Sequence, residues 1–157
     1  MDDCGRKWVM QMFMGEYHHN IDDKGRIVLP GKFRSNNMDK IVITRGLEQC
    51  LYLYTIEEWE KVVSKLNKLP FTKKDARTFM RSFFAGATAS EFDKAGRINI
   101  ASPLVNYAGL TKECVIIGVN DRIEIWDKKL YNDFMNENAS KLESIAENLF
   151  EVSDETL

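Results

Sequence analysis

Two five-residue segments of the sequence carry residue types suited to contacting a nucleic acid. Each has the form Asp-x-x-Gly-Arg, once from Asp22 to Arg26 and once from Asp93 to Arg97. The planar guanidinium of an arginine can donate two hydrogen bonds to guanine O6 and N7, and a nearby lysine can neutralise phosphate. The first segment also has basic neighbours in the sequence: Lys24, Lys32 and Arg34.

The same segments could serve the fold alone. Asp22 and Asp93 can accept backbone N–H bonds within a turn, and the arginines could pair with them at the surface for about 0–1 kcal/mol. Gly25 and Gly96 would supply the positive φ that a tight turn needs. The arginine is kept in both copies while neighbouring polar residues differ, which favours a functional role.

Residue patterns typical of catalysis are missing from the sequence. It has no Gly-x-Gly-x-x-Gly, Walker A, Gly-x-Ser-x-Gly or Cys-x-x-Cys motif. The two histidines, His18 and His19, are adjacent and would point to opposite faces of a strand, so they are poorly placed to share a metal. The doubled carboxylate Asp22-Asp23 becomes Asp93-Lys94 in the second copy. We therefore expect no enzymatic activity, metal, cofactor or small-molecule substrate.

The two segments belong to a longer internal repeat. Gly15 opens GEYHHNIDDKGRIVLPGKF and Gly86 opens GATASEFDKAGRINIASPL, at an offset of 71 residues. The copies realign at an offset of 72, where Leu51–Tyr54 matches Ile123–Trp126. Two copies of about 45 residues are too few for a solenoid, so they predict a pseudo-twofold pair of small modules.

Each copy predicts the same order of strands. Two short strands joined by the tight turn come first, at 16–21 and 27–29 or at 87–92 and 98–100. A helical turn follows, with Pro30 or Pro103 near its start, where a missing N–H is harmless. A β-hairpin comes next, at 40–44 and 50–54 or at 114–118 and 122–126.

Helices are expected after each hairpin. Thr55 begins a capping box for a helix at 56–66, and Thr72 is the expected cap of a second helix that ends near Ala85. A third helix is expected after Asp127, with an apolar stripe at Leu130, Phe134, Leu142, Ile145 and Leu149. Aromatic residues on these helices are expected in the core or at a subunit interface: Trp59, Phe79, Phe83, Phe84 and Phe134.

The predicted organisation is an α+β fold of two tandem modules. Residues 1–11 form an N-terminal extension outside the fold, 16–58 the first module, 59–86 connecting helices, 87–130 the second module, and 131–157 a C-terminal helix with an acidic tail. Apolar residues on the helices exceed what one small module can bury, which predicts a closed homo-oligomer.

Composition and charge bound the partners. The chain has 157 residues, ordinary globular composition and no apolar run near the roughly 18 residues of a membrane span. Three widely spaced cysteines favour a reducing cytosol. The net charge of −2 hides a division, with +4 over residues 12–90 and −6 over 91–157. A DNA-binding surface must therefore be local, or be assembled from several subunits.

Several segments, in order, resemble the MraZ family of transcriptional regulators. They are MFMGEYHHNIDDKGRIVLPGKF, TRGLEQCLYLY, LPFTKKDARTFMRSFFAGAT and DKAGRINIASPL. The resemblance covers Met12 to about Phe150. It implies two AbrB-type swapped-hairpin modules in a ring-shaped oligomer, often of eight or more subunits. It also implies binding of double-stranded promoter DNA at short repeated boxes upstream of the division and cell-wall gene cluster, hence a cytoplasmic, nucleoid-associated regulator.

The family's Asp-x-x-x-Arg residues correspond to Asp22 with Arg26 and to Asp93 with Arg97. The second copy departs from the first: Ala95 stands for Lys24, Ala101 for Pro30, and Pro103 and Val105 are not basic. This difference predicts a larger loss of DNA affinity for Arg26→Ala than for Arg97→Ala. Two other functions remain open. One is an antitoxin-like protein that binds a protein partner through the acidic segment Lys141–Leu157, and the other is a structural ring protein without a DNA role.

Overall fold

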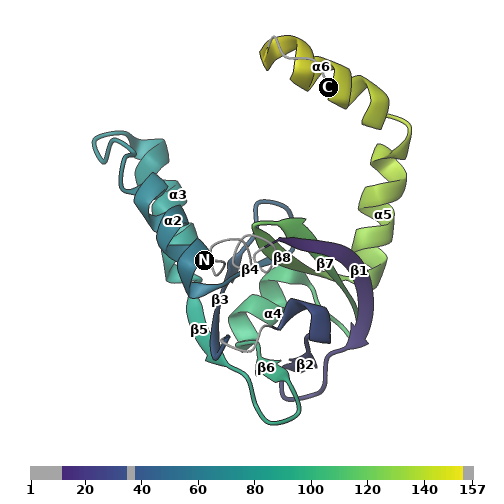
Figure 1. Ribbon diagram of the computed structural model, residues 1–157. Coiled ribbons are helices and arrows are strands. Elements are labelled where there is room, and N and C mark those ends of the chain that lie inside the picture. The colour runs from purple at the N-terminus through teal and green to yellow at the C-terminus, as the bar shows by residue number, and fades with distance from the viewer. Residues whose placement is uncertain (1–11, 35–37, 154–157) are drawn as a thin grey trace, which may run out of the picture. The chain divides into compact units, whose positions relative to one another are not determined.

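The computed structural model of the protein describes residues 12–34 and 38–153. The expected extension at 1–11 and residues 154–157 of the expected acidic tail lie outside the described residues. The chain divides into two units, residues 1–127 and residues 128–157. Figure 1 labels the elements of both.

Unit 1 is mixed α/β and contains two antiparallel sheets. The larger has six strands in the order β1-β7-β8-β4-β3-β5, and the smaller is the two-stranded ribbon β2-β6. The strands of the larger sheet are β1 (Phe13–Asn20), β3 (Lys40–Arg45), β4 (Leu51–Tyr54), β5 (Thr88–Glu91), β7 (Glu113–Asn120) and β8 (Arg122–Asp127). The ribbon consists of β2 (Arg26–Val28) and β6 (Arg97–Asn99).

Strands of the two sequence copies pair with each other. β1 of the first copy pairs with β7 of the second, and β5 of the second pairs with β3 of the first. Ile27 lies opposite Ile98 in the ribbon, and Tyr52 lies opposite Glu124 between β4 and β8. Both pairs join equivalent positions of the repeat, so the predicted pseudo-twofold axis passes through them.

The two strands that flank each Asp-x-x-Gly-Arg turn lie in different sheets. The turn therefore reverses the chain locally without beginning a hairpin, which differs from the tight hairpin turn that the glycine suggested. The reason is that each flanking strand finds its partner in the other copy. The predicted hairpins β3–β4 and β7–β8 are confirmed.

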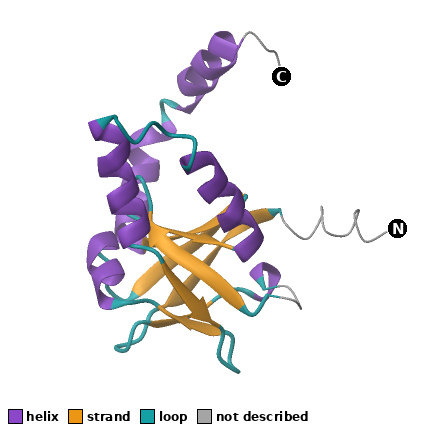
Figure 2. Cartoon of the chain, turned by 90° about the vertical axis from the view of Figure 1, so that its left-hand side faces the viewer, coloured by secondary structure: helices purple, strands orange, loops and turns teal. Residues whose placement is uncertain are grey.

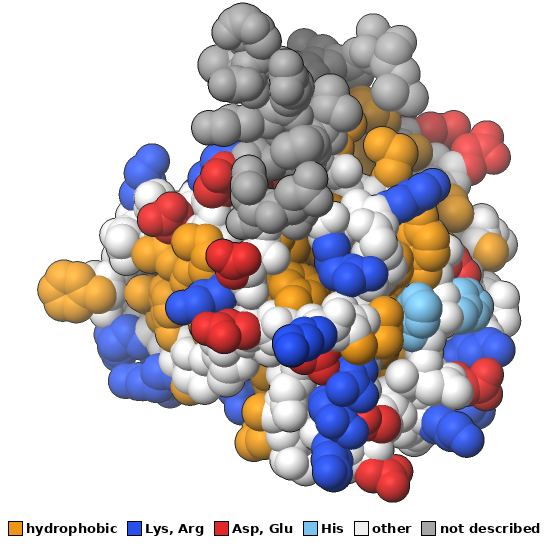
Figure 3. All heavy atoms as spheres, turned by 60° about the horizontal axis from the view of Figure 1, so that its bottom comes forward, with side chains coloured by type: hydrophobic (Ala, Val, Ile, Leu, Met, Phe, Trp, Pro, Cys, Tyr) orange, Lys and Arg blue, Asp and Glu red, His pale blue; other side chains and the backbone are white. Residues whose placement is uncertain are grey.

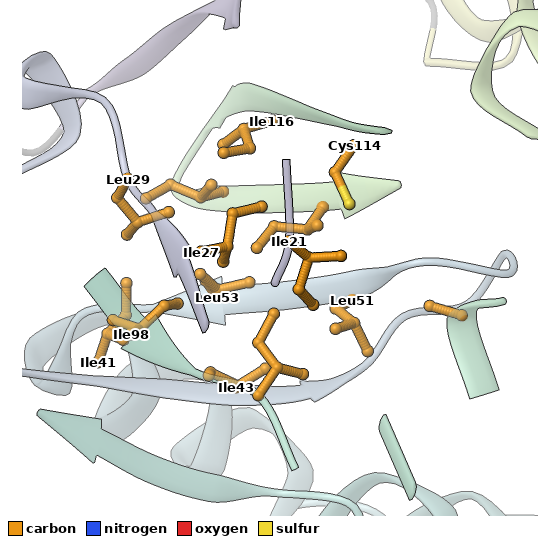
Figure 4. Packing of buried hydrophobic residues seen from close by; sticks show 14 of the residues in the cluster. Ile21, Ile27, Leu29, Ile41, Ile43, Leu51, Leu53, Ile98, Cys114 and Ile116 are labelled. Atoms are coloured by element: carbon orange, nitrogen blue, oxygen red, sulfur yellow. The ribbon is translucent and has the colours of Figure 1, made fainter. Parts of the chain in front are cut away.

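The hydrophobic core includes one face of the large sheet and the inward side of the ribbon. Alternate residues of the strands point into it, as Figure 4 shows for Ile41, Ile43, Leu51, Leu53 and Ile116. The ribbon contributes its central isoleucines, both almost fully buried. Helix α4 (Ser102–Ala108) adds Leu104, and the 3-10 turn η1 (Gly31–Phe33) adds Phe33. Burial of the central isoleucines ties the ribbon to the rest of unit 1.

Helices α2 (Ile56–Leu66) and α3 (Lys74–Ala85) pack on strand β3. Figure 2 shows them rising from the sheet and joined at their far ends. The Thr55 cap is confirmed, because its side chain accepts the Glu58 backbone N–H at 3.1 Å. The Thr72 cap is wrong. The Lys73 N–H donates to the Pro70 carbonyl at 3.0 Å, and this turn moves the start of α3 to Lys74.

The aromatic residues of these helices pack against one another. The Phe83 ring stacks on Trp59 and on Phe79, with centroids 5.5 Å apart in both pairs. The Thr44 hydroxyl of β3 donates to the Phe83 carbonyl at 2.6 Å, which ties α3 to the sheet. Phe83 is therefore a core residue of the single chain, whereas Trp59, Phe79 and Phe84 are half-buried.

Unit 2 consists of α5 (Lys128–Ala139) and α6 (Leu142–Ser153). The sequence predicted one helix here, and the break at residues 140–141 corrects it. Asn138 and Ser140 favour competing local hydrogen bonds over a continuous helix, and the Lys141 N–H donates to the Asn138 carbonyl at 3.0 Å. The expected stripe forms on α6, where Leu142, Ile145 and Leu149 are 53%, 41% and 65% exposed.

None of the described helices combines the length and the apolar character that a membrane crossing requires.

Candidate nucleic-acid interface

The first Asp-x-x-Gly-Arg turn is closed by its aspartate. The Asp22 Oδ1 atom accepts the backbone N–H groups of Lys24 and Arg26, both at 2.9 Å. Two backbone hydrogen bonds complete the turn, from Gly25 N–H to the Asp22 carbonyl at 3.0 Å and from Asp22 N–H to the Arg26 carbonyl at 2.9 Å. The carboxylate therefore holds the backbone on both sides of the glycine.

The second turn repeats this geometry. The Asp93 Oδ1 atom accepts the N–H groups of Ala95 and Arg97, again at 2.9 Å. The backbone bonds from Gly96 N–H and from Asp93 N–H have the same lengths as their counterparts, 3.0 and 2.9 Å. Two segments that share few other residues thus fold identically, because the Asp, Gly and Arg positions determine the turn.

Each aspartate also orients its arginine. The Arg26 Nε donates to Asp22 Oδ2 at 2.8 Å, and Arg97 Nε donates to Asp93 Oδ2 at the same distance. Hydrogen bonds from the arginine backbone N–H are the largest cause that lowers the pKa of Asp22 and of Asp93 below the usual value. Both carboxylates are therefore ionised at neutral pH.

The terminal Nη groups of both arginines remain available for a ligand. Among the described residues they have no hydrogen-bond partner, and the side chains of Arg26 and Arg97 are both 35% exposed. The structure therefore combines the two interpretations of the motif. The aspartate stabilises the turn, and at the same time it fixes the direction in which the guanidinium leaves the backbone.

The predicted positive φ of both glycines is confirmed, at +80° for Gly25 and +79° for Gly96. A Cβ at Gly25 would lie 2.5 Å from the carbonyl oxygen of Ile100. This carbonyl belongs to the second copy, and Ile100 N–H donates to the Gly25 carbonyl at 2.7 Å. The glycine is required both by its conformation and by this close backbone approach.

The β2–β6 ribbon presents the two arginines together. Arg26 lies opposite Asn99 and Arg97 lies opposite Val28, on either side of the buried Ile27–Ile98 pair. Because side chains alternate along a strand, these four residues share the face that points away from the core. The arginines are offset by two residues, roughly 7 Å along the strand direction. Figure 3 shows Lys and Arg side chains gathered at this end of unit 1, with Asp and Glu between them.

Arg34 lies at the second turn, although the sequence placed it beside the first. A Cβ at Gly96 would collide with the Arg34 guanidinium, whose Cζ would be 2.6 Å away. The assumption that Arg34 adds charge to the first turn is therefore wrong. It fails because the antiparallel ribbon brings the end of β2 to the second turn, where the Leu29 N–H donates to the Gly96 carbonyl at 3.2 Å. Sequence reasoning had no signal for this, since the two residues are 62 positions apart.

An open hollow of about 850 Å³ occupies the corresponding place at the first turn. It is lined by the turn and by α4 of the second copy, including Val105, which is the repeat equivalent of Arg34. Lys112 also lines it and was not singled out from the sequence. A long cation covers one turn, whereas a short apolar side chain leaves the other open.

The two turns also differ in formal charge. The first contains two carboxylates and two cations: Asp22, Asp23, Lys24 and Arg26. The second contains one carboxylate and two cations, Asp93, Lys94 and Arg97, and gains Arg34 from the other copy. Lys32 is exposed on η1. With Lys112 counted at the first turn, each turn has three cations, and the second is the more basic because it has one fewer carboxylate.

The described residues offer little support for a metal site or for nucleophilic catalysis. Across residues 12–34 and 38–153, no three His, Cys, Asp or Glu side chains come together as a metal site requires. His18 Nε2 lies 2.9 Å from Glu16 Oε2 at the surface. Burial raises the pKa of the Cys114 thiol to about 12 and raises that of Cys50 as well, which makes both poor nucleophiles.

The fold and the ribbon define a protein built from two tandem copies of one small module. The family model described as "MraZ protein, putative antitoxin-like" matches the chain twice, over residues 12–82 and 83–153. These two matches cover most of the sequence, so the chain belongs to the MraZ family.

Proposed function

We propose that this protein is a sequence-specific DNA-binding regulator of transcription that acts as a closed homo-oligomer. Its targets would be short repeated promoter boxes upstream of bacterial division and cell-wall genes, including its own gene. The observation that carries the proposal is the outward face of the β2–β6 ribbon, where two oriented arginines flank a pseudo-twofold axis. Membership of the MraZ family supports a DNA-binding regulator.

The geometry of the ribbon suits the major groove of DNA. A groove about 12 Å wide admits a two-stranded ribbon. A guanidinium whose Nε is held by an aspartate keeps both Nη groups free to donate to guanine O6 and N7. The arginine side chain is already ordered in the folded protein, so DNA binding does not have to supply the free energy of ordering it. More of the contact energy then remains for discrimination between bases.

A closed oligomer would raise affinity through several simultaneous contacts. One ribbon makes few base contacts, but linked copies bind successive boxes at a high effective concentration. Neutralisation of phosphates by Lys24, Lys94 and Arg34 would make the affinity fall as salt rises. Repeated boxes in the DNA and repeated ribbons in the oligomer would then match in number and spacing.

A mobility-shift assay with DNA from upstream of the host's division genes tests this function. At a stated salt concentration, the protein should retard this duplex and should bind a shuffled duplex of the same composition more weakly. Equal binding to both duplexes would leave a non-specific DNA-binding protein. No binding to either, by an oligomeric preparation, would contradict the proposal.

A second candidate is an antitoxin-like protein that binds a protein partner through residues 141–157. The acidic, exposed helix α6 and the wording of the family description favour it. An antitoxin tail is usually disordered alone, whereas α6 is helical through Ser153. A pull-down with unit 2 intact or deleted, in the absence of DNA, separates the two: a stable partner of different sequence would favour the antitoxin-like function.

A further inference from the structure

The hollow at the first turn distinguishes the two copies of the repeat. Val105 leaves it open, whereas Arg34, the repeat equivalent of Val105, covers Gly96 at the second turn. Its volume of about 850 Å³ lies within the range of small-molecule sites, roughly 300–1,000 Å³. Both ribbon arginines are expected to face DNA in the same way, so DNA contact by itself does not explain a hollow that is open at one turn and covered at the other.

Lys112, which immediately precedes β7, is held in place in the lining of this hollow. Its carbonyl accepts the Ile21 N–H at 2.9 Å. The preceding residue, Thr111, donates its N–H and its hydroxyl to Asp127 Oδ1, at 3.2 and 2.8 Å. Within the described chain the Lys112 ammonium group has neither an ion pair nor a hydrogen bond. A fixed segment of backbone therefore carries an uncompensated cation at the hollow.

Two further cations line the hollow, Lys24 and Arg26. The Arg26 Nη groups are free while Asp22 holds its Nε, and the Lys24 ammonium group has no partner among residues 12–34 and 38–153. The lining also contains two carboxylates. Asp22 already accepts three hydrogen bonds, so Asp23 is the carboxylate that is left to oppose an anion. Three cations against two carboxylates give the lining a net positive charge.

The side of the hollow that the second copy supplies is uncharged. Ile100 and Val105 contribute apolar surface, and Ser102 and Asn106 contribute a hydroxyl and an amide, both exposed on α4. Such a lining suits the organic part of a small molecule, because apolar side chains cover it and a few polar groups fix its orientation. The cations on the other side suit a phosphate group, since charge-assisted hydrogen bonds to its oxygens are the strong ones.

We propose that the hollow binds a small phosphorylated molecule, whose phosphate is held by Lys112, Lys24 and the free Nη groups of Arg26. Arg26 is one of the two ribbon arginines. A molecule that engages its guanidinium takes it away from DNA, so the bound molecule lowers the affinity of the first turn for DNA. This regulatory consequence rests on the proposed function, whereas binding in the hollow does not.

Titration calorimetry with inorganic pyrophosphate tests the site. Pyrophosphate offers phosphate groups without an organic part, and potassium chloride keeps the ionic strength constant. The wild-type protein should bind it saturably. Lys112→Gln should weaken binding by about tenfold or more, because one charge-assisted hydrogen bond is lost. Asp23→Asn removes the opposing carboxylate and should tighten binding by about twofold. No saturable binding, or no response to Lys112→Gln, would overturn the inference.

Lys40→Gln is the matched control. Lys40 begins β3, the strand of the first copy that corresponds to β7, and its Nζ lies 3.8 Å from Glu91 Oε1 at the surface. This variant loses the same charge as Lys112→Gln and should bind pyrophosphate as the wild-type protein does. An equal loss in both variants would show that pyrophosphate responds to overall charge rather than to the hollow, which would overturn the inference.

Competition with DNA separates this inference from the proposed function. At constant ionic strength, pyrophosphate should release the wild-type protein from the promoter duplex, and should release Lys112→Gln only at about tenfold higher concentration. Saturable binding without release of DNA would overturn the link to Arg26.

Two outcomes show which of the two proposals has failed. If pyrophosphate does not bind and Lys112→Gln lowers the slope of log K against log salt by about one, the hollow holds a phosphate of the DNA backbone. This inference then fails and the proposed function stands. If the protein binds pyrophosphate through Lys112 but does not bind DNA, the site in the hollow stands and the proposed function fails.

Discussion

The two Asp-x-x-Gly-Arg turns have the same backbone and different surroundings. Their hydrogen bonds have the same lengths, and the exposed fractions of their arginines are equal. The second turn has Arg34 over its glycine and one fewer carboxylate, whereas the first opens on a hollow of about 850 Å³. Identical local geometry therefore does not imply identical binding, because electrostatics depends on residues that the fold brings from elsewhere.

The largest expected effect concerns the arginines themselves. Arg97→Ala and Arg26→Ala should each lower DNA affinity, since a good bidentate base contact contributes about 1–3 kcal/mol. We now expect Arg97→Ala to cost at least as much as Arg26→Ala, because the second turn is the more basic. Fluorescence anisotropy with the promoter duplex measures both variants. A clearly larger loss for Arg26→Ala would restore the order that the sequence alone predicted.

Substitution of the two glycines by alanine should lower the free energy of unfolding by different amounts. Gly25→Ala forces a Cβ against the backbone carbonyl of Ile100, whereas Gly96→Ala meets the flexible end of Arg34. Both substitutions also strain a positive φ, at about 1–3 kcal/mol each. Urea unfolding should therefore show the larger loss of unfolding free energy for Gly25→Ala. Equal losses would mean that the φ strain alone determines the cost.

Arg34 should act on phosphate rather than on bases. Arg34→Ala should weaken binding about equally for the promoter and the shuffled duplex, and should reduce the slope of log K against log salt by about one. Lys129→Ala, which removes an exposed cation from α5 outside the ribbon, is the matched control. A loss confined to the promoter duplex would show that Arg34 reads a base instead.

The smallest effect concerns pH. The pKa values of Asp22 and Asp93 are lowered in the folded protein, so the stability that they contribute is present above the unfolded value near 3.8. It is lost as the pH falls through the lower folded pKa. The melting temperature of Asp22→Asn/Asp93→Asn should therefore be less sensitive to acid below about pH 4 than that of the wild-type protein. Parallel acid limbs would contradict a stabilising role for these carboxylates.

Local chemistry explains what the sequence could predict. The turns, the positive φ of Gly25 and Gly96, and the Thr55 cap depend on contacts within a few residues, so the residue types determine them. The two hairpins followed from β-rich runs separated by short loops. The offset of 71 residues predicted that Ile27 and Ile98 are equivalent, and the structure pairs them across the ribbon.

Non-local contacts account for the features that the sequence could not predict. Nothing in a local pattern selects β7 as the partner of β1, or carries Arg34 to Gly96. The Thr72 cap failed because Pro70 begins a turn that ends at Lys73. The stripe on α6 was correctly predicted as a helix face, but helical spacing alone does not say what covers it.

The specificity of the double variant Arg26→Ala/Arg97→Ala tests the central claim most directly. The quantity to measure is the ratio of affinities for the promoter duplex and a shuffled duplex, at one stated salt concentration and with light scattering to confirm that assembly is unchanged. If the ribbon arginines read bases, this ratio should fall to near one while weak, salt-dependent binding persists. A ratio equal to that of the wild-type protein would contradict the account, because the sequence would then be read by other residues.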